Sequence, residues 1–255
     1  DYIETSSPFT YIQPDNNLLG MGYAVQIHNN KIYFGTSSAL YQKDWRSYYN
    51  PITTSDYKIV PNSRGQVWNL LEFRDELLLH HHLGTFAIKN DVARKISSEL
   101  GSWLQIPIAE NKDVLIGGYY TGLATFKWNN GWKEAHRFDV NWKESCRIMV
   151  QDEKDNIWVS HPYRGAYRVE FNDNFSELGE ITLYNSGKGF PSDLQVYVFK
   201  IGDEAVFCAS KGIYSYNSTK DRFEPNEKWN KIFGINTWVK RLIEAPNGDV
   251  WFVTE

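Results

Sequence analysis

The stretch DEKDNIWVSHPYRGAYRV, residues 152–169, contains a polar turn, an apolar strand, a short loop, a glycine and an aromatic strand. Asp155 and Asn156 suit a tight turn, and the apolar Ile157–Val159 that follows is typical of a buried strand. The same order of features recurs along the chain. A repeat of this kind decides the fold before any single residue does.

Six apolar triplets mark the copies, and they follow one another at intervals of about 37 to 48 residues. They are Ile32-Tyr33-Phe34, Leu77-Leu78-Leu79, Val114-Leu115-Ile116, Ile157-Trp158-Val159, Ala205-Val206-Phe207 and Val250-Trp251-Phe252. A pair of turn-forming residues stands before each triplet, from Asn29-Asn30 in the first copy to Asn247-Gly248 in the last. A small residue and an aromatic strand follow the triplet in the first five copies. The spacing predicts short strands in groups of four.

An all-β fold, a β-propeller built of four-stranded blades, is therefore expected. We expect six repeat units within one domain spanning 1–255, as part of a longer, seven-bladed ring. Residues 1–17 would give the outer strand of a preceding blade, and 236–255 the first two strands of a further one. A β-sandwich also has many short strands, but it gives no reason for the same turn, strand and loop pattern to recur six times at a regular interval. Two short helices are also predicted, at 91–100 and 226–233.

Composition narrows the classes of partner. The net charge is −4 with both signs interspersed, so no basic stripe predicts nucleic-acid binding by this segment. No run reaches the ~18 apolar residues of a membrane span, so this segment is not expected to contact a membrane. The two cysteines, Cys146 and Cys208, both lie in apolar runs, which excludes a disulfide framework. We interpret the chain as a piece of a longer protein.

The repeat resembles the two-component regulator propeller family. Asp155-Asn-Ile-Trp-Val159 with Gly165-Ala-Tyr-Arg168 carries the resemblance best, followed by Gly248-Asp-Val-Trp-Phe252. Gly189-Phe-Pro-Ser-Asp193 is also similar to the propeller region of bacterial ligand-sensing regulators. The resemblance implies a periplasmic sensor in a membrane-anchored protein, with a histidine kinase or LuxR-type helix-turn-helix output elsewhere. The sequence departs from the family pattern at His80-His81-His82 and at Cys208-Ala209.

Catalytic, metal and cofactor motifs are not expected. His80 and His82 could share one strand face, but no spaced cysteine or histidine completes a zinc site. The acidic residues fall mostly in turns, and no nucleophile elbow or phosphate loop is present. Two alternatives stay open: a polysaccharide lyase or glycosidase built on a propeller, and a structural or dimerising propeller without a ligand.

A ligand site is predicted where loops converge. In a propeller, the loop between the second and third strands of a blade shares a face with the segment leading into a first strand. Aromatic rings beside hydrogen-bonding groups suit a sugar, so a small molecule or oligosaccharide is the expected ligand. The candidate residues are Trp68, Trp103, Tyr119, Tyr120, His161, Tyr163, Arg164 and Trp238.

Overall fold

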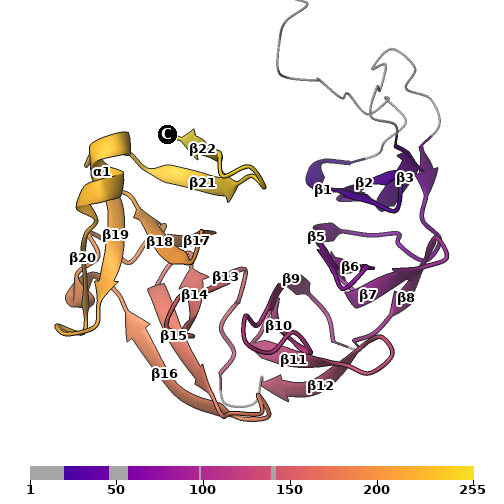
Figure 1. Cartoon of the computed structure of the whole chain (residues 1–255), viewed down its shortest axis with the longest axis horizontal. Coiled ribbons are helices and arrows are strands. Elements are labelled where there is room, and N and C mark those ends of the chain that lie inside the picture. The colour runs from indigo at the N-terminus through magenta and orange to yellow at the C-terminus, as the bar shows by residue number, and fades with distance from the viewer. Residues whose placement is uncertain (1–19, 46–56, 98, 139–141) are drawn as a thin grey trace, which may run out of the picture. The chain divides into compact units, whose positions relative to one another are not determined.

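The computed structural model describes residues 20–45, 57–97, 99–138 and 142–255. These residues form two compact units divided between Lys95 and Ile96. Each described unit consists of antiparallel sheets in which consecutive strands pair (Figure 1). The expected outer strand at 1–17 lies outside the described residues.

The first unit holds two four-stranded sheets, which we call blades 1 and 2. Blade 1 comprises β1 (Gly22–His28), β2 (Lys31–Thr36), β3 (Leu40–Asp44) and β4 (Lys58–Ile59). Blade 2 comprises β5 (Val67–Phe73), β6 (Glu76–His81), β7 (Gly84–Lys89) and β8 (Val92–Lys95).

The second unit holds blades 3, 4 and 5 and one two-stranded sheet. Blade 3 comprises β9 (Ser102–Pro107), β10 (Val114–Tyr119), β11 (Leu123–Trp128) and β12 (Trp132–Phe138). Blade 4 comprises β13 (Ile148–Gln151), β14 (Ile157–His161), β15 (Gly165–Phe171) and β16 (Leu178–Tyr184), followed by the 3₁₀ turn η1 (Ser186–Lys188). Blade 5 comprises β17 (Tyr197–Ile201), β18 (Glu204–Ala209), β19 (Gly212–Asn217) and β20 (Arg222–Pro225). Helix α1 (Glu227–Phe233) leads to the pair β21 (Val239–Glu244) and β22 (Val250–Thr254).

The hairpin turns adopt the backbone that their residues favour. Asn29 and Asn30 have φ of 47° and 59°, and Arg74 and Asp75 have φ of 53° and 57°. Two successive residues at positive φ give the tight turn that matches the twist of two paired strands. The turn residues predicted before the triplets are therefore confirmed in these two hairpins.

Blade faces pack on one another inside each unit. In the second unit, Ile157 and Val159 of β14 join a core shared with blade 3, whereas Trp158 faces blade 5 and packs with Phe207. This alternation follows from the two-residue period of a strand. The predicted four-stranded all-β fold is confirmed in the described residues.

Two sequence predictions are wrong in detail. Residues 91–100 were expected to include a helix, but Val92–Lys95 is the fourth strand of blade 2, paired with β7. In the third copy, Ile116 rather than Leu115 is the counterpart of Trp158, because Ile116 faces the next blade. The helix expected at 226–233 is confirmed as α1, where the Asn226 side chain accepts a hydrogen bond from the Trp229 N–H.

Candidate functional site

Backbone hydrogen bonds bring the predicted loops of the second unit together. The Tyr120 N–H donates to the Gly101 carbonyl over 2.8 Å, and the Cys146 N–H donates to the Tyr119 carbonyl over 3.0 Å. The Gln195 N–H donates to the Pro162 carbonyl over 3.0 Å. Loops between second and third strands thus contact segments that lead into first strands. We call this group of loops the mouth of the second unit: residues 99–103, 119–122, 142–147, 161–164, 193–197, 210–211 and 235–238.

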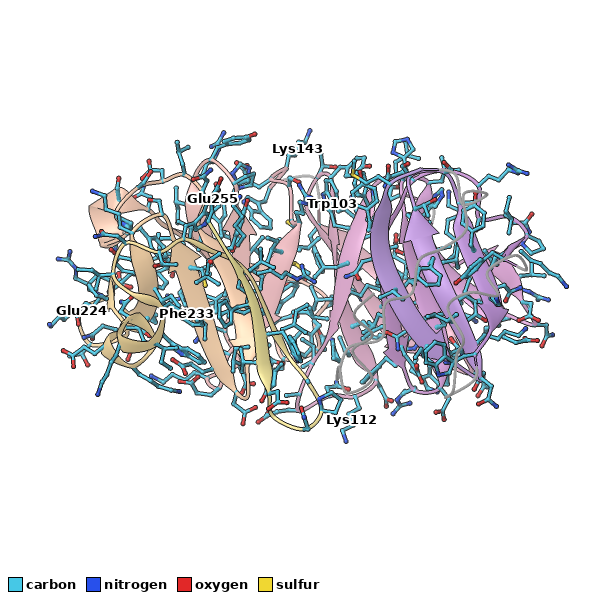
Figure 2. All side chains as sticks on the ribbon, turned by 90° about the horizontal axis from the view of Figure 1, so that it is seen from above. Trp103, Lys112, Lys143, Glu224, Phe233 and Glu255 are labelled. Carbon is cyan, nitrogen blue, oxygen red and sulfur yellow. The ribbon has the colours of Figure 1, made fainter. Side chains whose placement is uncertain are left out.

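The mouth lies at one end of the strands. Figure 2 places Trp103 and Lys143 near one edge of the blades and Lys112 near the opposite edge. Lys112 belongs to the β9–β10 turn, so the two ends of blade 3 carry different groups. The hairpin turns and the mouth are therefore separate surfaces.

Trp103 and Tyr120 form an aromatic platform at the mouth. Their ring centroids are 4.7 Å apart with an interplanar angle of 55°, and both side chains are half-buried. The Trp103 Nε1–H donates to Ser145 Oγ over 3.1 Å, which fixes the orientation of the indole. The Arg147 guanidinium lies 5.1 Å from the centroid of the Trp103 ring. An aromatic face beside a hydroxyl and a guanidinium can stack a ring and bind its polar substituents.

Glu144 lies next to Ser145 in the chain, but its side chain contacts His161 and Arg164 rather than the aromatic platform. Its carboxylate is 3.2 Å from His161 Nε2 and 3.3 Å from Arg164 Nη1. The Glu144 carbonyl also accepts a hydrogen bond of 2.8 Å from the Gly122 N–H of blade 3. Segment 142–147 therefore separates an aromatic side of the mouth from an ionic side.

The tautomer of His161 follows from its partners. Its Nδ1 accepts from the Tyr163 N–H over 3.2 Å, so a neutral ring carries its proton on Nε2, which lies 3.2 Å from a Glu144 carboxylate oxygen. Burial lowers the pKa of His161 from its usual value, although the Glu144 carboxylate opposes this. The ring is therefore neutral at neutral pH, with its Nε2–H beside the Glu144 carboxylate.

The remaining candidates of the second unit differ in exposure. Tyr163 is 72 % exposed, as a loop residue would be. Tyr119 is fully buried at the end of β10, and its hydroxyl donates to Ser97 Oγ over 2.9 Å, so it shapes the mouth from beneath. Trp238 packs on Tyr197, with centroids 5.7 Å apart, beneath the Lys240 ammonium. Sequence reasoning missed Glu144, Ser145 and Arg147, because nothing in the sequence tells which side of the segment each one occupies.

Trp68 belongs to the first unit. Its ring contacts Tyr23 edge-on, with centroids 5.3 Å apart, and it is half-buried. In the same unit, His80 and His81 are fully buried in β6. The His81 Nδ1 accepts a hydrogen bond from the Leu83 N–H, and burial lowers the pKa of His81. Within the described ranges, His, Cys, Asp and Glu form no group of three that could hold a metal ion.

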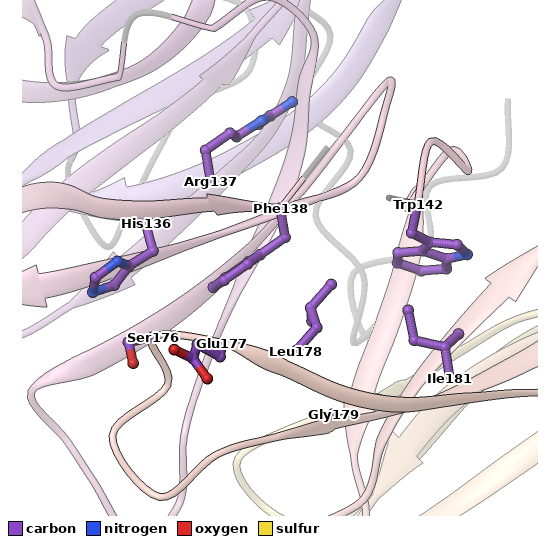
Figure 3. Close-up of a pocket in the computed structure, with 9 residues that line it drawn as sticks. All are labelled: His136, Arg137, Phe138, Trp142, Ser176, Glu177, Leu178, Gly179 and Ile181. Carbon is purple, nitrogen blue, oxygen red and sulfur yellow. The ribbon is translucent and has the colours of Figure 1, made fainter. Parts of the chain in front are cut away.

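A concavity lies at the outer rim of blades 3 and 4, away from the aromatic platform. A cavity of about 500 Å³ opens between β12 and β16, and we call it the rim pocket (Figure 3). Phe138, Leu178 and Ile181 point into it, whereas Arg137 turns away (Figure 3) and stacks 4.0 Å from the centroid of Tyr119. His136, Ser176 and Glu177 form its polar end. The pocket continues the apolar core between the two blades outward to solvent.

No protein-family model and no curated protein matches the chain. Among solved structures, the chain is similar to the extracellular domain of what is described as a one-component system, BT4673, from B. thetaiotaomicron. That match has 13 % identity and a TM-score of 0.62, and it covers 96 % of this chain and 32 % of that one. The extracellular domain of what is described as a hybrid two-component system, BT3049, of the same organism matches at 14 % identity and a TM-score of 0.60, over 92 % of this chain and 32 % of that one.

The WD40 β-propeller domain of Doa1 also matches, at 8 % identity and a TM-score of 0.50, over 91 % of this chain and 88 % of that one. At such identities the likeness shows the fold alone. The chain thus has the blade architecture of a β-propeller, and it spans about a third of the length of the two B. thetaiotaomicron domains. Among the described residues, no helix is long and apolar enough to cross a bilayer.

Proposed function

We propose that the chain is a ligand-sensing propeller segment of a bacterial signalling protein, and that it binds a carbohydrate at the mouth of its second unit. The observation that carries the proposal is the Trp103–Tyr120 platform with Ser145 and Arg147 beside it. Sugars bind through the apolar face of the ring and through hydroxyl hydrogen bonds, and this group offers both kinds of contact.

The wider assignment rests on the structural neighbours. Two of them are extracellular domains of signalling systems, which supports a periplasmic sensor whose output module lies elsewhere in a membrane-anchored protein. The propeller fold by itself serves many functions, so the fold supports this role only together with the mouth.

The proposal is tested by isothermal titration of the chain with a panel of neutral and acidic oligosaccharides. We expect one class to bind, and we expect Trp103→Ala to weaken binding at least about tenfold, because the surface on which the sugar ring stacks would be lost. Trp251→Ala is the matched control, since Trp251 is 51 % exposed on β22 outside the mouth. Equal loss in both variants, or no binding across the panel, would contradict the proposal and favour a structural or dimerising role.

An enzymatic alternative has one observation in its favour. His161 Nε2 lies 3.2 Å from a Glu144 carboxylate oxygen, and a histidine beside a carboxylate can act as a general base if a substrate replaces the Tyr163 N–H at its Nδ1. A lyase would release unsaturated sugar products from a polysaccharide, and His161→Gln would abolish that release. We expect no product, because Glu144 also binds Arg164 and so holds a structural role in the loop.

A further inference from the structure

The mouth of the second unit carries cations that the protein itself does not neutralise. Lys143, Arg147 and Lys211 are exposed, and within the described residues none of them forms an ion pair with a carboxylate. Lys240 differs, because it pairs with Glu255. The mouth therefore carries unpaired positive charge, although the net charge of the whole chain is −4.

The carboxylates of the same loops are mostly engaged. Glu144 binds His161 and Arg164 on the far side of segment 142–147 from Trp103. Asp193 accepts a hydrogen bond from the Ser186 N–H, and its contacts with Ser186 lower the pKa of Asp193. Glu99, which is half-buried, is the remaining acidic residue of the described mouth. The aromatic side of the mouth thus has an excess of positive charge.

Arg147 holds its charge beside the aromatic platform. Its guanidinium lies 5.1 Å from the Trp103 centroid, and Trp103 is itself held by Ser145. A planar guanidinium presents a fork of N–H donors that matches carboxylate and sulfate oxygens. A ring stacked on the platform would therefore bring one of its substituents next to a preplaced cation.

We propose that the ligand of the mouth is an acidic saccharide, whose carboxylate or sulfate ester is bound by Arg147, with Lys143 of the same loop adding to the positive charge. This inference rests on the proposed function and specifies its ligand class. Neutral saccharides use the same platform but form weaker hydrogen bonds with the cations than an anionic group does.

Three trisaccharides with the same sugar skeleton distinguish a carboxylate ligand, a neutral ligand and a sulfate ligand. They are trigalacturonate, its carboxyl-reduced trigalactose, and a sulfate ester of that trigalactose. Isothermal titration is run at low and at raised salt. We expect at least one acidic form to bind about tenfold or more tightly than trigalactose, and we expect raised salt to reduce the difference. Binding of one acidic form or of both supports the inference and identifies the anionic group.

Arg147→Gln is the test variant, and Lys112→Gln on the opposite edge is its matched control. Arg147→Gln should remove most of the preference for the acidic form, and Lys112→Gln should leave it unchanged, with the thermal midpoints of both variants checked against the parent chain. Equal binding of acidic and neutral forms would overturn this inference and leave the proposed function standing. Failure of all saccharides to bind would overturn both.

Discussion

Trp158 and Trp251 occupy the same position in the repeat, yet their surroundings differ. Trp158 is fully buried, its Nε1–H donates to Asp152 Oδ2 over 2.7 Å, and its ring lies 5.1 Å from the ring of Phe207. Trp251 is 51 % exposed. Three of the four aromatic rings around Trp158 belong to blade 5, so this repeat position is buried chiefly by the blade that follows it.

The largest expected effect is the loss of the buried ring. Trp158→Ala should lower the free energy of unfolding by about 3–5 kcal/mol, because it leaves a cavity among four aromatic neighbours. Trp251→Ala should lower it by less than about 1 kcal/mol, since the ring is half in solvent. Urea unfolding of both variants measures this contrast. Equal losses would mean that burial by the next blade is not what stabilises this position.

The second effect concerns the hydrogen bond that Trp158 makes. Asp152→Ala leaves the Trp158 indole N–H buried without its acceptor, which should cost about 1–3 kcal/mol. Asp249→Ala in the β21–β22 turn removes only a contact with Asn247, and we expect less than about 0.5 kcal/mol. The same urea series gives both values. A cost in Asp249→Ala as large as that in Asp152→Ala would contradict the comparison.

The third effect is a dependence on pH at the seam between blades 4 and 5. Lys188 beside Asp221, with the hydroxyls of Tyr184 and Tyr216, holds the pKa of Asp221 well below its usual value of 3.8. The unfolded chain then binds a proton that the folded chain resists, so stability present above about pH 3.8 is lost as the pH falls further.

Asp221→Asn should therefore flatten the acid limb of a plot of unfolding free energy against pH. Asp249→Asn is the control, because it lies in the exposed β21–β22 turn, and it should leave the acid limb unchanged. An unchanged limb in Asp221→Asn would show that this seam does not contribute to acid sensitivity.

The smallest effect is a difference between the two thiols. Burial raises the pKa of Cys208 to about 12 and that of Cys146 well above its usual range, so both should react slowly in the folded chain. Cys208 packs beneath β21, whereas Cys146 lies in the core between two four-stranded blades. Single-thiol variants should therefore show faster labelling of Cys208. Faster labelling of Cys146 would mean that the β21–β22 sheet opens less often than the contact between blades 3 and 4.

Much of the scaffold could be predicted from the sequence, because the repeat carries its own turn residues and strand pattern. The third copy shows the limit: the sequence aligns Leu115 with Trp158, but the alternation of strand faces gives that position to Ile116. Residues 91–100 show another, since pairing of Val92–Lys95 with β7 overrides local helix preference.

The candidate site was harder to predict. The sequence indicated Trp103 and Tyr120, and the structure brings them together. It also indicated Tyr119 as a loop residue, but that side chain is buried. Glu144 and Arg147 escaped notice because their roles depend on which side of a non-repetitive segment each one faces, and no period in the sequence reports this.

Hydrogen–deuterium exchange of the chain, with and without a bound saccharide, locates the ligand without any substitution. If a saccharide binds at the mouth, we expect slower exchange in the mouth loops of the second unit, at 119–122, 143–147 and 161–164, and no change at the rim pocket strands β12 and β16. Slower exchange confined to β12 and β16, with the mouth loops unaffected, would contradict it.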